Sequence, residues 1–485
     1  MAFSSSLFLV YFLPVFLIPL FLLDRKYKNY WILIASVVFY MWGAPRFAFV
    51  LIGSVFIDFY LLRWMSEKEG KTRQLLFWTS LLLNLGLLLY FKYMNFFIEQ
   101  LDILFGYFGA NPSHWVKIAL PLGISFITFQ KLAYTLDVYK KQFTPFKKPG
   151  QYAMYILMFP QLLSGPIVRP KQIASQIADR SGQESIDDRL TGFFRFAIGL
   201  AKKVLIADVL GEQVNAIFAM HSFQLSSGMA WIGAIAYTFQ IYFDFSGYTD
   251  MAIGIARMMG FRLPENFNSP YVSGSITEFW KRWHMTLGSW FRDYVFLPIA
   301  YSISRKLPKE KYLWIRADKV IYLIATSVTF LLCGFWHGAA WTFILWGVYQ
   351  GAFLIFDKLF LLKIFKKAGR IGSVIVTFFI TVFGWVLFRS ESLDFFRFYI
   401  RRMFAFRGGD NDLWLNPKFW TVLLIAAVFS FIGFRKKVES WQGRLYDKPG
   451  SALIIGFSLL AIILFILSLA SITSTGFSPF IYFRF

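Results

Sequence analysis

A single histidine, His337, lies near the middle of a segment, 321–356, that contains no acidic or basic residue. An ionisable ring inside a long apolar segment is costly to bury and is by default a candidate for function. Cys333 lies four residues earlier and would share a helix face with His337, which suggests a thiolate nucleophile with its base. The structural alternatives are a cysteine that only packs and a histidine that only hydrogen-bonds between helices.

A second histidine, His284, stands 53 residues before His337 in a basic and aromatic stretch. Cations and indole rings together can hold the phosphates and the adenine of a nucleotide-bearing cofactor. The same composition also suits anionic lipid head groups, and the sequence leaves both readings open. The residues concerned are Lys281, Arg282 and Arg292, with Trp280, Trp283 and Trp290 among them.

Two carboxylates, Asp244 and Asp250, lie within the apolar block 229–255. An intramembrane carboxylate can orient a histidine, line a polar tunnel or pair with a nearby arginine, and the sequence does not separate these roles. Neither His337 nor His284 has a carboxylate or a further histidine at ligand spacing, so we expect no metal site.

The elements that must position these residues are membrane helices. The chain has 485 residues, of which 57% are hydrophobic and only 16% charged, and its mean hydropathy is +0.54. This composition is typical of an all-α, polytopic integral membrane protein. Spans or near-spans are expected at 7–23, 31–42, 47–62, 75–91 and 118–138, several of them short enough to require tilt or partial crossing.

The formal net charge of +23 comes from short basic clusters between hydrophobic blocks, not from one basic domain, so no nucleic-acid partner is expected. The clusters place their loops in the cytoplasm by the positive-inside rule and the N-terminus outside it. The alternation of cytoplasmic and external loops that this rule predicts fails near 389–407, where five arginines fall on the nominally external side. The first apolar block lacks a positive n-region and a cleavage site, which indicates a retained helix.

Three regions interrupt the regular alternation of spans and loops. The segment 153–169 is apolar but contains two prolines and a glycine, which favours a re-entrant or broken segment. The segment 260–301 is only weakly apolar, as expected for helices at the cytoplasmic interface. Around His337, Gly334 and Gly338 favour two shorter helices that meet near the histidine. With no linker between folding units, we expect one domain over 1–485.

Seven stretches, in order along the chain, resemble the membrane-bound O-acyltransferases, and within them the bacterial branch typified by the alginate O-acetyltransferase membrane subunit. They are Thr-Phe-Gln-Lys-Leu-Ala-Tyr-Thr-Leu-Asp-Val-Tyr at 128–139, Phe-Pro-Gln-Leu-Leu-Ser-Gly-Pro-Ile at 159–167, Gln-Ile-Tyr-Phe-Asp-Phe-Ser-Gly-Tyr at 240–248, Pro-Glu-Asn-Phe-Asn-Ser-Pro-Tyr at 264–271, Arg-Trp-His at 282–284, Trp-His-Gly-Ala-Ala-Trp at 336–341 and Gly-Trp-Val-Leu-Phe-Arg at 384–389.

The resemblance implies a ring of about 10–12 membrane helices around a thinned centre, in the bacterial inner membrane. It makes His337 the catalytic histidine and His284 the second signature position. His337 would then be the base that accepts a hydroxyl proton, and His284 would position the donor or polarise its carbonyl. The donor would be cytoplasmic acetyl-CoA, with no tightly bound cofactor, held by residues at 281–292: Lys281, Arg282, Trp283 and Arg292.

The same resemblance implies a periplasmic or surface SGNH-type transferase as partner and a polysaccharide, such as alginate, peptidoglycan or cellulose, as final acceptor. Three alternatives stay open at this point. They are D-alanyl transfer to a cell-envelope polymer, a non-catalytic transporter or flippase, and a scaffold that only anchors the partner.

Overall fold

The computed structural model describes residues 2–109, 111–220, 224–307, 309–312, 315–406, 408–409, 413, 415–435, 437–440, 451–476 and 478–481. Within these residues the chain is almost entirely helical, which confirms the predicted fold class. The described residues form one small hairpin, in which β1 (Lys311–Tyr312) pairs antiparallel with β2 (Ile315–Arg316). The described residues divide into two compact units. The expectation of a single domain stays a prediction.

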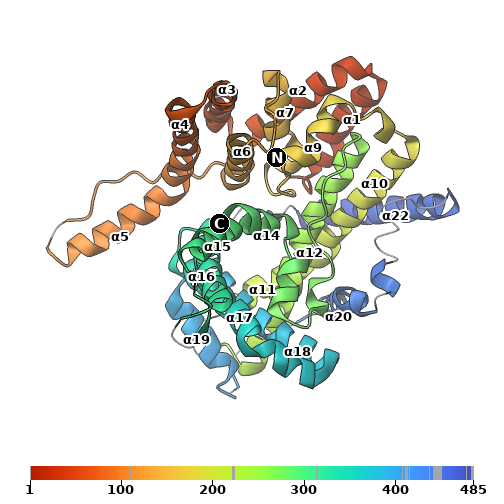
Figure 1. The fold of residues 1–485 in the computed structure, drawn as a ribbon. Coiled ribbons are helices and arrows are strands. Elements are labelled where there is room, and N and C mark those ends of the chain that lie inside the picture. Colours follow the sequence, from red (N-terminus) through yellow and green to blue (C-terminus); the bar gives the residue numbers. More distant parts are fainter. Residues whose placement is uncertain are drawn as a thin grey trace. The chain divides into compact units, whose positions relative to one another are not determined.

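Unit 1 comprises the described residues of Met1–Gly192 and Ala252–Pro264. Its elements are η1 (Leu7–Phe12), α1 (Leu13–Leu22), α2 (Arg25–Gly43), α3 (Pro45–Glu67), α4 (Gly70–Leu88), η2 (Leu89–Tyr93), α5 (Met94–Gly106), α6 (Ile124–Tyr139), α7 (Pro149–Leu157), α8 (Phe159–Leu162), α9 (Pro170–Ala178), η3 (Ser181–Gln183), the start of α10 (Ile186–Ala201) and the end of α12 (Ser227–Met258). Figure 1 shows α3 and α4 side by side. Helix α5 carries no buried residue.

Unit 2 comprises the described residues of Phe193–Met251 and Glu265–Phe485. Besides the rest of α10 and α12, its helices are η4 (Lys202–Ala207), α11 (Asp208–Phe218), η5 (Pro270–Val272), α13 (Ile276–Arg282), α14 (Met285–Phe291), η6 (Arg292–Phe296), α15 (Leu297–Lys306), α16 (Ala317–His337), α17 (Trp341–Phe356), η7 (Asp357–Leu361), α18 (Leu362–Arg389), α19 (Leu393–Met403), α20 (Pro417–Phe431), η8 (Ile432–Phe434) and α22 (Ser451–Thr475).

Six helical runs in the described residues are long and apolar enough to cross a bilayer. A multi-pass membrane protein is thereby supported, although length and apolarity alone identify fewer crossings than the expected 10–12. One run, Trp341–Arg389, has 49 residues and exceeds the ~20 that a single crossing needs. The runs are Pro45–Glu67, Gly70–Gly106, Ala317–His337, Trp341–Arg389, Pro417–Phe434 and Gly456–Ser474.

The expected span at 118–138 is corrected at its start, because α6 begins only at Ile124. Gly123 precedes it with a φ of +76°, a left-handed conformation that cannot continue a helix. A Cβ at Gly123 would also lie 2.6 Å from the carbonyl oxygen of Leu162, so the chain passes too closely there for another residue. The apolar block in the sequence therefore begins before the helix, whose first residue is set by the local backbone geometry at Gly123.

The predicted break in 153–169 is confirmed. Helix α7 ends at Leu157, α8 is a single turn, and residues 163–169 are not helical. Every residue from 152 to 168 is buried, as irregular backbone at membrane depth requires. The backbone N–H of Phe159, at the break, donates to Ser36 Oγ at 3.1 Å.

Candidate functional site in unit 2

His337 is the last residue of α16, and α17 begins four residues later at Trp341. The prediction of two shorter helices meeting near this histidine is confirmed. The two helices pack closely because both carry a glycine at the crossing: a Cβ on Gly334 would lie 2.9 Å from Gly347 Cα. A Cβ on Gly338 would overlap the ring of Phe343, so the residue after the histidine must also be small.

The imidazole of His337 is enclosed by aromatic rings and is only 5% exposed. Three rings meet it edge to face, with centroid separations of 4.8 Å for Trp336, 4.9 Å for Trp346 and 5.3 Å for Phe388. Such walls keep water away from the ring while fixing its plane. Cys333, one turn earlier, is buried at 3% exposure.

His284 is completely buried and occupies the residue before α14 in a left-handed conformation, with φ 44° and ψ 51°. A non-glycine residue in that region costs energy and persists where the surroundings hold it. Burial lowers the pKa of the His284 imidazole to about 3, so the ring is neutral at physiological pH.

The tautomer of His284 follows from its partner, Asn266. The side-chain atom of Asn266 that faces the ring also accepts the backbone N–H of Thr286 at 3.2 Å, so it is the carbonyl oxygen Oδ1. His284 Nδ1 lies 3.0 Å from this oxygen and must therefore carry the proton. In this neutral tautomer Nε2 is the acceptor atom of the ring and cannot donate a hydrogen bond.

The aromatic ring of Trp336 lies close to both histidines. Trp336 lies 4.8 Å from His337 and 6.2 Å from His284, centroid to centroid. His284 also meets the ring of Phe245 edge to face at 4.7 Å. Both predicted catalytic histidines thus belong to one continuous aromatic cluster in unit 2.

The four residues predicted to contact the donor lie in different environments. Trp283 is 1% exposed and packs 4.7 Å from Trp385, so its ring is part of the core. Arg282 is held by two carboxylates, Glu278 at 2.9 Å and Glu439 at 2.6 Å, which raise the pKa of its guanidinium against the opposing effect of burial. The other two are exposed cations: Lys281, and Arg292, whose side chain is 63% exposed and pairs with the adjacent Asp293.

Each of the two predicted intramembrane carboxylates is paired with cations. Asp244 lies 2.8 Å from Lys203, and Asp250 accepts from Arg195 at 2.7 Å and from Lys202 at 2.6 Å. Of the roles left open, charge pairing is therefore the arrangement these residues adopt. It is also the arrangement expected of charges buried in a membrane protein, because an unpaired ion would be very costly.

The sequence analysis missed Asn266, although Asn266 lies in the stretch 264–271. It also missed a buried ion pair in unit 1, between Asp58 on α3 and Lys131 on α6, at 3.9 Å. The signal was present, since both are charged residues inside expected spans. Asp58 also accepts hydrogen bonds from hydroxyl and amide groups: Ser80 at 2.6 Å, Asn84 at 3.2 Å and Tyr152 at 2.7 Å.

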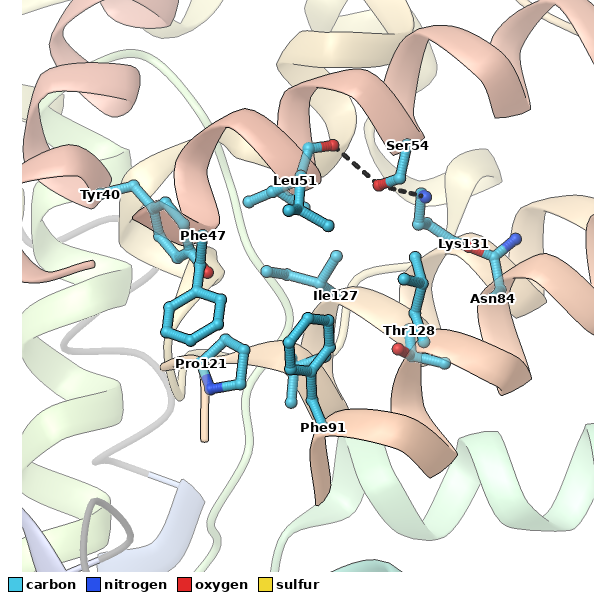
Figure 2. Close-up of a pocket in the computed structure, with 13 residues that line it drawn as sticks. Tyr40, Phe47, Leu51, Ser54, Asn84, Phe91, Pro121, Ile127, Thr128 and Lys131 are labelled. Atoms are coloured by element: carbon cyan, nitrogen blue, oxygen red, sulfur yellow. Dashed lines mark hydrogen bonds between the residues drawn. The ribbon is translucent and has the colours of Figure 1, made fainter. Parts of the chain in front are cut away.

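A small cavity of about 40 Å³ adjoins this network in unit 1, as Figure 2 shows. Lys131 lies at its wall and donates to Ser54 Oγ at 3.0 Å, whereas the rings of Phe47 and Phe91 line another part. The volume is enough for two or three water molecules and far below that of a ligand pocket. We therefore regard it as a feature of packing and hydration.

Comparison with known proteins supports the family assignment. A model of the family MBOAT, membrane-bound O-acyltransferase family, matches residues 122–388, which include His284 and His337. The chain is 34% identical to Probable alginate O-acetylase AlgI of Pseudomonas syringae pv. tomato, with 100% of both chains covered. It is 32% identical to the Peptidoglycan O-acetyltransferase of Helicobacter pylori, over 81% of this chain and 77% of that one.

A third relative is the Teichoic acid D-alanyltransferase of Bacillus subtilis, 32% identical over 56% of this chain and 69% of that one. The resemblance inferred from the seven stretches is thus confirmed at the level of the family. The protein is a multi-pass membrane enzyme that belongs to the membrane-bound O-acyltransferase family.

Proposed function

We propose that this protein takes acetyl groups from cytoplasmic acetyl-CoA and passes them across the membrane for O-acetylation of an extracytoplasmic polysaccharide. The observation that carries the proposal is the setting of His337. It is a buried imidazole, walled by aromatic rings, at the junction of α16 and α17. The two relatives named for O-acetyl transfer, which cover most of this chain, support acetyl as the group transferred.

In the proposed reaction His337 is the general base. As the acceptor oxygen attacks the thioester carbonyl carbon, the imidazole takes the hydroxyl proton. The tetrahedral intermediate collapses, the carbon–sulfur bond breaks, and the coenzyme A thiolate receives that proton. The aromatic walls around His337 reduce the chance that water attacks the thioester instead.

His284 then acts as a positioning group for the donor. Its neutral tautomer, with the proton on Nδ1, lets Nε2 accept a hydrogen bond but not donate one to a developing oxyanion. Of the two roles considered for His284, holding the donor is therefore the better supported. A suitable donor group for this bond is an amide N–H of the pantetheine arm of acetyl-CoA.

The phosphates of coenzyme A would meet exposed cations. Lys281 and Arg292 are the proposed contacts because both are exposed, whereas Arg282 is largely covered and lies between Glu278 and Glu439. Trp283 contributes to the core beneath this surface, since its ring is buried. Surface lysine and arginine side chains bind phosphate through charge-assisted hydrogen bonds.

For the cellular setting, we propose the bacterial inner membrane, with the N-terminus outside the cytoplasm. A periplasmic or surface SGNH-type transferase would receive the acetyl group and deliver it to the polymer. Alginate, peptidoglycan and cellulose are the acceptors to compare. The relatives named for alginate and peptidoglycan acetylation support a polysaccharide as the class of acceptor.

Donor choice tests this proposal. Purified protein in lipid nanodiscs, supplied with the partner transferase and a glycan acceptor, should release coenzyme A thiol from acetyl-CoA. Release only from D-alanyl carrier protein would replace acetyl transfer by D-alanyl transfer. Movement of intact donor or acceptor across liposomes without thiol release would show a transporter, and polymer acetylation that persists with His337→Ala would show a scaffold.

A further inference from the structure

A short segment near the end of the sequence, 478–481, is hydrogen-bonded to α12 in unit 2. The backbone N–H of Ile481 donates to Asp244 Oδ2 at 2.8 Å. Lys203 lies 2.8 Å from the other oxygen of Asp244 and 2.6 Å from Asp208, and it also donates to the carbonyl oxygen of Pro479 at 3.5 Å. A buried carboxylate and its cation thus hold the backbone of this segment on both sides of Phe480.

These contacts with Asp244 and Lys203 place the ring of Phe480 in the core, where it is 2% exposed. The ring stacks on Tyr248 at 4.6 Å and lies 5.7 Å from Phe245, centroid to centroid. Phe245 in turn meets His284 edge to face at 4.7 Å. A continuous row of rings therefore runs from Phe480 through Phe245 to the imidazole.

The orientation of the His284 ring is held by the hydrogen bond to Asn266 and by the rings around it, among them Phe245, Trp336 and Phe267. The hydrogen bond to Asn266 fixes the Nδ1 end, but a single bond leaves the ring plane free to rock about it. The edge contact with Phe245 opposes that motion, since aromatic pairs have a preferred geometry. Phe245 keeps its own place partly because Phe480 fills the space beside it.

We propose that Phe480 is a positioning residue for His284: the anchored segment 478–481 holds the Phe245 ring, and that ring orients the imidazole. The inference rests on the proposed role of His284 in holding the donor. Asp244 and Lys203 acquire a role through it, because their ion pair is the anchor of the segment.

The test compares three variants of Phe480 with a matched control. Phe480→Ala should raise the KM for acetyl-CoA about five- to tenfold with little change in kcat. Phe480→Leu restores volume without a flat ring and should leave KM raised, whereas the ring-preserving Phe480→Tyr should restore it. The control is Phe457→Ala, which removes a ring stacked on Phe194 in a separate cluster of the same unit and should leave KM at the native value.

The KM of a double variant tests more directly whether Phe480 acts through His284. In a His284→Ala background, Phe480→Ala should cause no further rise in KM, because the residue acts through that histidine. Equal KM values for Phe480→Leu and native protein, or additive effects in the double variant, would overturn the inference and leave Phe480 as packing. If Phe480→Ala fails to fold, the Leu and Tyr variants decide the matter.

A spectroscopic arm separates this inference from the proposed function. In protein with ¹⁵N-labelled histidine, the His284 resonances, assigned from their loss in His284→Gln, should shift in Phe480→Ala and keep native positions in Phe457→Ala. That shift would support the inference even for a protein that does not use acetyl-CoA. Unchanged His284 resonances in Phe480→Ala would contradict it whatever the donor.

Discussion

The indole ring of Trp336 lies 6.2 Å from the imidazole ring of His284, centroid to centroid. Trp336 is the residue before His337 in the chain. The last turn of α16 therefore carries His337 and also contacts His284 through Trp336. This arrangement brings together two histidines that are 53 residues apart in the sequence, as the proposed reaction requires. The tautomer of His284, its burial and the helix crossing beside His337 can each be tested by substitution.

The first prediction concerns the tautomer of His284. Asn266→Asp places a carboxylate beside Nδ1 and should raise the pKa of the imidazole from its native value of about 3. Once protonated, Nε2 can no longer accept a hydrogen bond, so KM for acetyl-CoA should rise as the pH falls through the new pKa. Steady-state kinetics between pH 5 and 9 measure this. Asn111→Asp, at an exposed position in unit 1, is the control, and parallel profiles for the two variants would contradict the assignment.

The second prediction concerns stability and pH. The pKa of His284 is about 3 in the folded protein and, by its ordinary value, 6.5 when exposed, so the unfolded state binds the extra proton between these limits. Folding stability should therefore fall as the pH falls from 6.5 towards 3, by at most about 1.4 kcal/mol per pH unit, and this contribution should be constant above 6.5. Melting temperatures of native protein and His284→Gln in detergent should converge as the pH is lowered. A difference that does not vary with pH would show that His284 is not buried in its neutral form.

The third prediction concerns the crossing of α16 and α17. Gly334→Ala introduces a Cβ that would lie 2.9 Å from Gly347 Cα, so one helix must move and the ring of His337 moves with it. Activity should drop sharply, with a loss of roughly 1–3 kcal/mol in stability. Gly228→Ala is the matched control, because nothing lies within 4 Å of its added Cβ. Native activity and melting temperature for Gly334→Ala would contradict the close packing.

The fourth prediction concerns the ion pair in unit 1. Lys131→Met leaves the buried carboxylate of Asp58 without its cation and should destabilise the protein by about 3–5 kcal/mol. Asp58→Asn in the same chain removes the uncompensated charge and should restore most of the loss. Thermal unfolding of the two single variants and the double variant forms a complete cycle. Additive losses would mean that the two side chains do not depend on each other.

Local patterns in the sequence account for part of this structure. The absence of charge around His337, with Gly334 and Gly338 beside it, was enough to predict a helix break there, because these constraints are local. The pairing of Arg282 with Glu439 and of Asp58 with Lys131 was not predictable in the same way. These partners are distant in sequence and are brought together only by tertiary packing, which hydrophobic periodicity does not encode.

The start of a helix also depends on local backbone geometry that composition does not reveal. The apolar stretch 118–138 predicts one span, yet a left-handed Gly123 delays α6 until Ile124. The basic and aromatic stretch around His284 fits either a nucleotide or anionic lipid head groups, and its composition does not show how its side chains are placed. The fold buries Trp283, pairs Arg282 with two carboxylates and leaves Lys281 and Arg292 exposed.

If His337 is the base of the transfer reaction, release of coenzyme A thiol must depend on its imidazole. Purified native protein and His337→Gln are compared in nanodiscs with acetyl-CoA, the partner transferase and a glycan acceptor, after equal insertion and equal melting temperatures have been established. Glutamine keeps a polar side chain of similar reach but cannot accept the proton. We predict that kcat falls about 10²- to 10⁴-fold while binding of acetyl-CoA is retained. Thiol release at the native rate by His337→Gln would show that His337 is not the base.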